Sequence, residues 1–247
     1  MVPGLAFLAA AVATVFALST LKRYTTRRAP HERVWTIALA LFAFASVALA
    51  LGSSGGWDAG TFRVFYLLGA ILNVPWLALG TVYLLLGRTI GRRVETGLVF
   101  FSGLAVGVMF STPIIGPVTR ATIPVGKDVF NAFPRVLAAI GSGVGATVII
   151  VGAVVSAVGF FRRRSDPGAG RMAAANALIA IGTLTLSSGG LMQGVIGHDE
   201  AFALSLAIGI SVIFAGFSVA TASSPRTTAR AASPPGAGRS GVAQHAT

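Results

Sequence analysis

The sequence predicts an all-α membrane protein: a polytopic bundle of seven transmembrane helices with the N-terminus outside and the C-terminus in the cytoplasm. Of its 247 residues, 54% are hydrophobic and 11% are charged, whereas a soluble domain carries about 25% charged residues. The apolar residues form repeated runs, and about 20 such residues cross a hydrocarbon core of about 30 Å as a helix. The charges lie between these runs.

Each run has its own boundary signals. The first follows Met1 without a basic segment, so it reads as a retained span and not as a cleaved signal peptide. The third contains Asn73 and Pro75, and the fourth carries Ser111-Thr112-Pro113 towards its outer end. The predicted spans are Pro3–Leu21, Val34–Leu51, Val64–Leu86, Leu98–Val118, Pro134–Phe161, Asn176–Gly197 and Phe202–Ala222.

The basic residues predict the orientation. All but four of the 19 Lys and Arg residues fall in the loops after spans one, three and five or in the C-terminal tail. Cytoplasmic loops carry the excess of Lys and Arg, so these segments belong inside. The opposite side has Arg63, Arg120, Lys127 and Arg135 together with four acidic residues. This alternation requires an odd number of spans.

Two domains follow from this pattern: a seven-helix transmembrane domain over residues 1–222 and a disordered cytoplasmic tail over residues 223–247. The tail is rich in Ser, Pro, Ala, Gly and Arg and lacks large apolar residues. Arg162, Arg163 and Arg164 in the loop before span six either bind anionic lipids of the bilayer or serve only to fix the topology. The net charge of +12 is explained by the membrane, so we expect no nucleic-acid partner.

The residue types exclude several kinds of chemistry. There is no cysteine, which excludes disulfides and thiolate ligands. No ionisable residue lies deep inside a predicted span, which argues against a proton pump or a retinal protein. The three histidines cannot form a haem-binding pair, and His198-Asp199-Glu200 reads as a solvated turn more readily than as a metal site. We therefore expect no enzymatic activity, no cofactor and no resident metal.

The third span carries the candidate binding residues. On a helix, Tyr66, Asn73, Trp76 and Tyr83 fall with two glycines within an arc of about 100°, and Pro75 lies outside it. An unsatisfied amide in lipid costs several kcal/mol, so Asn73 should face the bundle interior and find a partner there. Pro75 predicts a kink. This face is either ordinary packing or the wall of a ligand cavity, to which Gln193 of span six would contribute.

Small residues four apart predict close helix approach at Gly103/Gly107, Gly141/Gly145 and Gly190/Gly194. Each of spans six and seven also gathers small or polar residues on one face: Gly182, Thr185, Gly189 and Gln193 in span six, and Ser205, Gly209 and Gly216 in span seven. Such faces pack helices of one chain or of a partner membrane protein or second copy.

Most of the chain except the tail resembles a family of uncharacterised actinobacterial seven-span membrane proteins. The likeness is carried by "WDAGTFRVFYLLGAILNVPWLALGTVYLL" (57–85), "GRMAAANALIAIGTLTLSSGGL" (170–191) and "AFALSLAIGISVIFAGF" (201–217). The chain is also similar, less closely, to the seven-span sensory modules of bacterial histidine kinases, which have a basic first cytoplasmic loop and a Pro-Trp stretch in the third span. No kinase domain follows span seven here, so a sensor would signal through another protein.

Two functional classes follow. The first is a membrane sensor or accessory subunit of the plasma membrane that binds a small or lipidic ligand within the bundle or assembles with a partner. The second is a facilitator for a small neutral solute, which the absence of coupling carboxylates permits. A facilitator needs a polar path from Asn73 to both faces, whereas a sensor needs a sealed cytoplasmic half.

Overall fold

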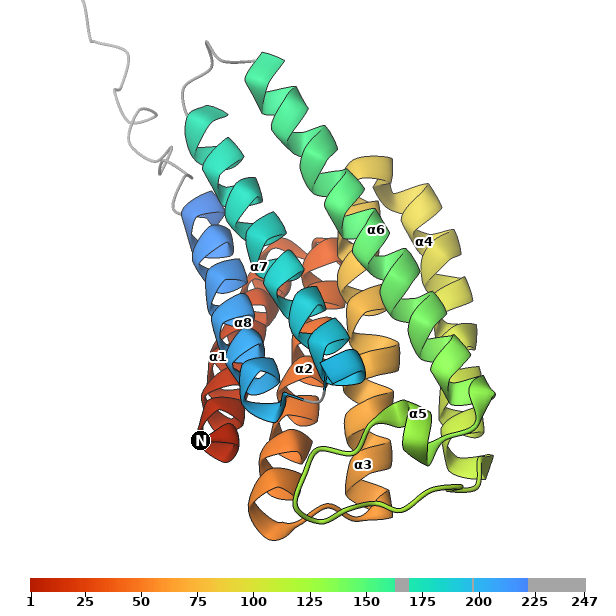
Figure 1. Ribbon diagram of the computed structural model, residues 1–247. Helices are drawn as coiled ribbons and strands as arrows, with labels where there is room; N and C mark the ends of the chain where they lie inside the picture. The colour runs from red at the N-terminus through yellow and green to blue at the C-terminus, as the bar shows by residue number, and fades with distance from the viewer. Residues whose placement is uncertain (163–168, 197, 222–247) are drawn as a thin grey trace, which may run out of the picture.

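The computed structural model describes residues 1–162, 169–196 and 198–221, which form helices joined by short turns and one longer segment (Figure 1). The elements in chain order are α1 (Val2–Arg27), α2 (Pro30–Gly55), α3 (Ala59–Phe65), the π-helix η1 (Tyr66–Leu72), α4 (Asn73–Ser111), α5 (Gly126–Val129), α6 (Ala132–Arg162), α7 (Ala169–Ile196) and α8 (Asp199–Thr221). No strand occurs in these three ranges. The predicted all-α class is confirmed.

Six helical segments of the described chain are long and apolar enough to cross a membrane. They are Val2–Arg27, Pro30–Gly55, Ala59–Ser111, Ala132–Gly159, Gly170–Gly190 and Asp199–Ala220. Large apolar side chains such as Phe100, Phe110 and Val144 are exposed on the outside of the bundle, as expected for surfaces that face lipid. The chain is therefore a multi-pass helical membrane protein.

The segment Ala59–Ser111 is a helical hairpin. Its 53 residues would extend about 80 Å if straight, far more than a bilayer core. Gly87 breaks the helix with φ 79° and ψ −176°, a left-handed conformation that favours glycine. Across this turn Tyr83 contacts Glu95, Trp76 contacts Ser102 and Arg63 contacts Met109. Since the partners lie progressively further from Gly87, the limbs 59–86 and 88–111 run antiparallel, as Figure 1 shows.

The kink predicted at Pro75 takes the form of the π-helix η1, which lies directly before it. The backbone N–H of Asn73 donates to the carbonyl of Leu68, five residues earlier. Pro75 has no N–H to continue the ladder, and a wider turn relieves the strain. The Ser142 hydroxyl of α6 donates to the Ala70 carbonyl at 2.6 Å, so α6 supports the loosened turn.

Glycines allow the close packing of α6 against the first limb of the hairpin, residues 59–86, which we call the central limb. A Cβ on Gly141 would lie 2.7 Å from the Ile71 carbonyl oxygen, and one on Gly145 would lie 3.0 Å from the Val74 carbonyl. The predicted role of the Gly141/Gly145 pair is confirmed. Gly103 and Gly107 instead face open space, so the expectation that they pack against another helix is wrong for the described part of the chain.

Helices α7 and α8 pack through the small residues predicted for spans six and seven. A Cβ on Gly182 would meet the Gly209 carbonyl at 2.7 Å, and one on Gly189 would meet the Ser205 hydroxyl at 1.6 Å. In Figure 1 the two helices lie side by side, and α8 in turn lies beside α1.

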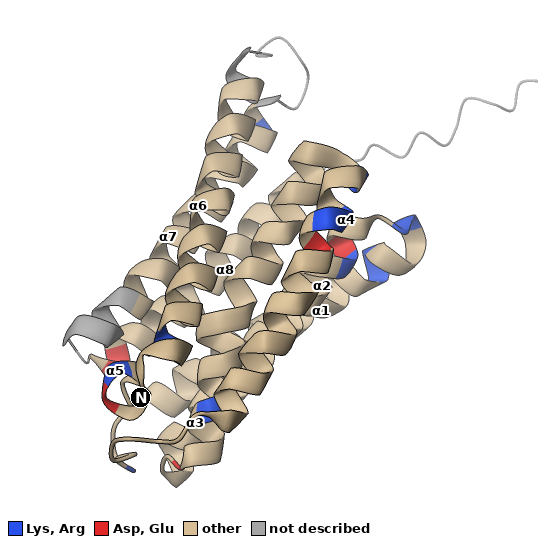
Figure 2. Cartoon of the chain, turned by 90° about the vertical axis from the view of Figure 1, so that its right-hand side faces the viewer, with Lys and Arg blue, Asp and Glu red and all other residues tan. Residues whose placement is uncertain are grey.

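The charged residues gather at the two ends of the bundle (Figure 2). We call the end with the α1–α2 turn and the Gly87 turn the basic end, and the end with residues 112–131 the acidic end. At the basic end Arg28 adopts φ 52° and Pro30 starts α2, so the connection is much shorter than the predicted loop. At the acidic end α4 stops at Ser111 and not at the predicted Val118, because Pro113 disfavours a helical conformation at Thr112.

Candidate functional site

The main polar site of the described residues lies at the basic end and is built around two glutamates. Glu32 lies in the first turn of α2, and Glu95 lies two helical turns after Gly87 in α4. The short α1–α2 turn and the hairpin bring these segments to the same end of the bundle (Figure 2). We refer to Arg23, Glu32, Arg33, Tyr83 and Glu95 as the basic-end network.

Glu32 is buried, with 1% of its surface exposed. Its Oε1 accepts hydrogen bonds from Arg23 Nε at 2.9 Å and Arg23 Nη2 at 2.6 Å. His31 Nε2 lies 3.8 Å from the same oxygen. The second oxygen, Oε2, is buried and has no hydrogen-bond partner among the described residues. A buried carboxylate requires pairing to offset its desolvation, and here only one of its two oxygens is paired.

The surroundings of Glu32 tie three helices together. Arg23, which comes from α1, places its guanidinium 4.5 Å from the centre of the Phe217 ring of α8, a cation–π contact. The Thr36 hydroxyl of α2 donates to the Glu32 carbonyl at 2.8 Å and lies 2.9 Å from the Thr20 hydroxyl of α1. The charge on Glu32 is thereby linked to the position of α8.

Glu95 ties α2 to both limbs of the hairpin. It accepts hydrogen bonds from the Arg33 guanidinium of α2 and from the Tyr83 hydroxyl of the first limb. Tyr83 is buried and its ring lies on Gly91, where a Cβ would come within 2.4 Å of Cδ1. Glycine at position 91 is thus required for the aromatic ring to reach between the limbs.

The predicted binding residues of the third span are only partly brought together. Tyr66 packs on the Phe130 ring with centroids 5.2 Å apart, Trp76 Nε1 donates to Ser102 Oγ at 3.1 Å, and Tyr83 belongs to the basic-end network. Asn73 is 8% exposed, but its amide forms no hydrogen bond with the side chains or backbone that the structure describes. The side chain of Gln193 lies outside the described residues, as do those of Arg162, Arg163 and Arg164.

Both faces of the central limb are buried, which the sequence did not indicate. Ile71 and Leu79, on the face opposite Asn73, are as buried as the polar face. The limb packs against α2, α6 and its own second limb. Burial of the polar face therefore does not by itself distinguish a ligand site from packing.

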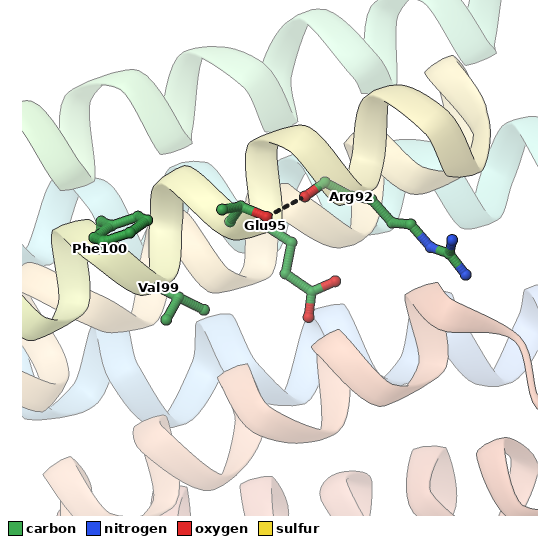
Figure 3. A pocket seen from close by; sticks show the side chains of 5 residues that line it. Arg92, Glu95, Val99 and Phe100 are labelled. Carbon is green, nitrogen blue, oxygen red and sulfur yellow. Dashed lines mark hydrogen bonds between the residues drawn. The ribbon is translucent and has the colours of Figure 1, made fainter.

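Neither Asn73 nor Trp76 lines either of two hollows that lie in the described part of the chain. One, of about 360 Å³, lies on α4 beside Glu95 (Figure 3). The other, of about 200 Å³, lies at the acidic end between the start of α1, Trp57 and Asp199. Asp199 there accepts a hydrogen bond from the Ile123 backbone N–H at 2.9 Å. No group of three His, Asp or Glu residues within the described ranges is arranged to hold a metal ion.

Sequence reasoning missed Glu32 and Glu95 because both lie in loops that the charge pattern assigned to topology alone. A signal was present: apart from Asp166, they are the acidic residues of the strongly basic loops that the charge pattern predicts to be cytoplasmic. An acidic residue among arginines at the end of a span is a candidate ion-pair partner for a neighbouring helix.

Comparisons with known proteins add no relative. No protein-family model, no curated protein and no solved structure matches the chain.

Proposed function

We propose that the chain is a non-catalytic sensor or accessory subunit of the plasma membrane, with seven crossings, the N-terminus outside and the C-terminus in the cytoplasm. The seventh crossing comes from counting the limbs 59–86 and 88–111 separately. The observation that carries the proposal is the basic-end network, in which two carboxylates join α1, α2 and both limbs of the hairpin.

Such a network suits signalling because it is held by charge and is incompletely paired. A cation that approaches Glu32 Oε2, or an anion that draws Arg33 away from Glu95, would change which helices are held together. A ligand shifts a conformational equilibrium only through differential contacts with the two states, and ion pairs at a helix end supply such contacts. The signal would be a change in the position of the α1–α2 turn relative to the Gly87 turn.

The interior between Asn73 and the basic end supports a sealed bundle over a facilitator. This stretch of the central limb contains buried Ala78, Leu79 and Val82. The Trp35 indole fills the space beside Gly80, where a Cβ would come within 1.9 Å of Nε1. A neutral solute crossing here would find apolar side chains where a path needs hydrogen-bonding groups.

The test uses cysteine pairs, which are simple to place because the chain has no native cysteine. Thr26→Cys and Thr89→Cys report on the basic end, and Ser54→Cys and Ser111→Cys report on the acidic end. All four positions are exposed. In cells, a membrane-impermeant maleimide should label positions 54 and 111 from outside and leave 26 and 89 unlabelled. The reverse pattern would overturn the orientation.

The same pairs, spin-labelled in lipid nanodiscs, test the switch. Replacing Glu95→Gln removes the charge that binds Arg33 and should add a second distance population between labels at 26 and 89. The distance between labels at 54 and 111 should not change. A single unchanged distance at both ends would reduce the network to a static brace and contradict the sensor assignment.

The facilitator alternative has its own test. Proteoliposomes and empty liposomes are compared in stopped-flow light scattering with glycerol and urea. Equal swelling rates are expected, and faster swelling that Asn73→Leu abolishes would establish the facilitator instead.

A further inference from the structure

The hollow on α4 has five lining residues, and all of them lie on one helix face. They are Arg92, Glu95, Thr96, Val99 and Phe100. The spacing i, i+3, i+4, i+7, i+8 is that of a single face of an α-helix. Figure 3 shows Arg92 at one end of this row, Glu95 in the middle and Phe100 at the other end.

One end of the hollow is suited to an anion. Arg92 is exposed and forms no ion pair with any residue of the described ranges, where Glu32 pairs with Arg23 and Glu95 with Arg33. The Glu95 charge in the wall is offset by Arg33 and the Tyr83 hydroxyl. Arg88, one helical turn before Arg92, adds positive charge. A phosphate can accept two parallel hydrogen bonds from a guanidinium.

The other end of the hollow is suited to a hydrocarbon chain. Val99 and Phe100 are exposed, and Leu104 continues the apolar surface one turn further along the helix. From Arg92 to Phe100 the helix rises about 12 Å, which takes the row from the headgroup region into the hydrocarbon core. From the end of the bundle towards the membrane interior, the lining thus changes from cationic to apolar. A phospholipid changes from a charged headgroup to hydrocarbon in the same direction.

The geometry points to a binding site for one anionic phospholipid of the surrounding leaflet, with its phosphate on Arg92 and an acyl chain on Val99 and Phe100. The inference deepens the proposed function, on which it rests, because Glu95 belongs both to the wall of this hollow and to the basic-end network. An anionic headgroup beside Arg92 would lie close enough to act electrostatically on the ion pair between Glu95 and Arg33. The sensed ligand would then be the anionic lipid of the membrane itself.

The test is native mass spectrometry of the full chain in detergent, titrated with phosphatidylglycerol or with phosphatidylcholine of the same acyl chains. The first phosphatidylglycerol should bind in preference to phosphatidylcholine. Arg92→Gln should weaken that first binding by about tenfold, the loss of a charge-assisted contact. Arg93→Gln removes the same charge from a neighbouring position outside the hollow and should leave the first binding unchanged.

The apolar half and the source of the phosphate are tested in the same way. Phe100→Ala should weaken the first phosphatidylglycerol by about fivefold, which is the loss of roughly 40 Å² of apolar contact. Phe110→Ala, a control at another exposed phenylalanine outside the hollow, should have no effect. Competition by inorganic phosphate at millimolar concentration should fail.

Three results would overturn the inference: equal binding of the two lipids, equal effects of Arg92→Gln and Arg93→Gln, or displacement of the lipid by inorganic phosphate. None of these would alter the spin-label distances that test the proposed function. Conversely, a static basic end would leave the lipid binding in place. Failure of the site and failure of the sensor are therefore separate outcomes.

Discussion

The basic end and the acidic end of the bundle are held together by different forces. At the basic end, Glu32 and Glu95 pair with arginines from other segments, and the aromatic rings there, such as Trp35 and Phe217, lie beside these ion pairs. At the acidic end the Phe62 and Phe130 rings stack with centroids 5.3 Å apart, and Trp57, Phe65, Tyr66 and Phe202 surround them. Backbone hydrogen bonds from the Trp57 N–H to the Arg120 carbonyl and from the Ile115 N–H to the Val129 carbonyl fix the segment of residues 112–131 at this end.

Because of this difference, we expect the two ends of the bundle to respond differently to a nearby charge. Aromatic packing depends mainly on buried area and ring geometry, so it responds less to a nearby ion than an ion pair does. Buried ion pairs depend on both partners, and loss of one leaves an uncompensated charge. We therefore expect the acidic end to act as the rigid frame and the basic end as the part whose arrangement an anionic lipid or a partner can alter.

The largest expected effect comes from breaking the pair at Glu32. Arg23→Met leaves the buried carboxylate with only His31 nearby and should reduce the free energy of unfolding by about 3–5 kcal/mol. The measurement is unfolding in mixed detergent–SDS micelles followed by circular dichroism. Arg27→Met, an exposed position on the same helix, should change stability by no more than about 0.5 kcal/mol.

A double variant then distinguishes charge from packing. Arg23→Met combined with Glu32→Leu removes both charges and should recover most of the lost stability, because an apolar pair of similar volume replaces the ion pair. If the double variant is as unstable as Arg23→Met alone, the basic end is held by packing and the contrast between the two ends fails.

A smaller effect is expected at Arg63, the main charged contact of the acidic end. Its guanidinium donates to the Met109 carbonyl and, at 2.7 Å, to the Thr112 carbonyl, which closes the end of α4. Arg63→Met should lower the free energy of unfolding by about 1.5–3 kcal/mol. Arg63→Lys keeps the charge but not the planar fork, so it should recover only part of the loss.

Combined with the spin labels, the Arg63→Met variant also tests whether the two ends of the bundle are independent. Since its partners are neutral carbonyls, Arg63→Met should destabilise the whole fold without adding a second distance at the basic end. A second population between labels at 26 and 89 in Arg63→Met would show that the two ends are coupled and would contradict the description of the acidic end as a frame.

The parts of the fold that follow from hydrophobic length could be predicted, and those that depend on tertiary contact could not. The apolar runs located every long helix, and Gly141 and Gly145 were assigned to close packing correctly. Gly103 and Gly107 have the same spacing yet face outward, because spacing does not say whether a neighbouring helix is present. The site was harder still. In the sequence, Glu32 is one of several charged residues in a loop. Only the sharp turn at Arg28 and Pro30 places Arg23 against it.

The smallest effect is expected at Asp58, the cap of α3 at the acidic end. Its Oδ1 accepts hydrogen bonds from the backbone N–H groups of Gly60 at 2.8 Å and Thr61 at 3.1 Å, and its Oδ2 accepts one from the Thr61 hydroxyl at 2.5 Å. These bonds, the hydroxyl first and the Thr61 N–H next, hold the pKa of Asp58 below its ordinary value of 3.8. Asp58→Ala should cost about 1 kcal/mol at neutral pH.

The pH dependence of this cap has a definite sign. Because the folded-state pKa is lowered, the stabilisation by the carboxylate is complete above the unfolded pKa near 3.8 and is lost as the pH falls through the folded pKa. Asp58→Asn keeps a neutral cap, so its melting temperature should fall less than that of the native chain on acidification through this range. Parallel melting curves for the two proteins would mean that the carboxylate charge adds nothing to the cap, and that the acidic end is stabilised entirely by its aromatic packing and backbone hydrogen bonds.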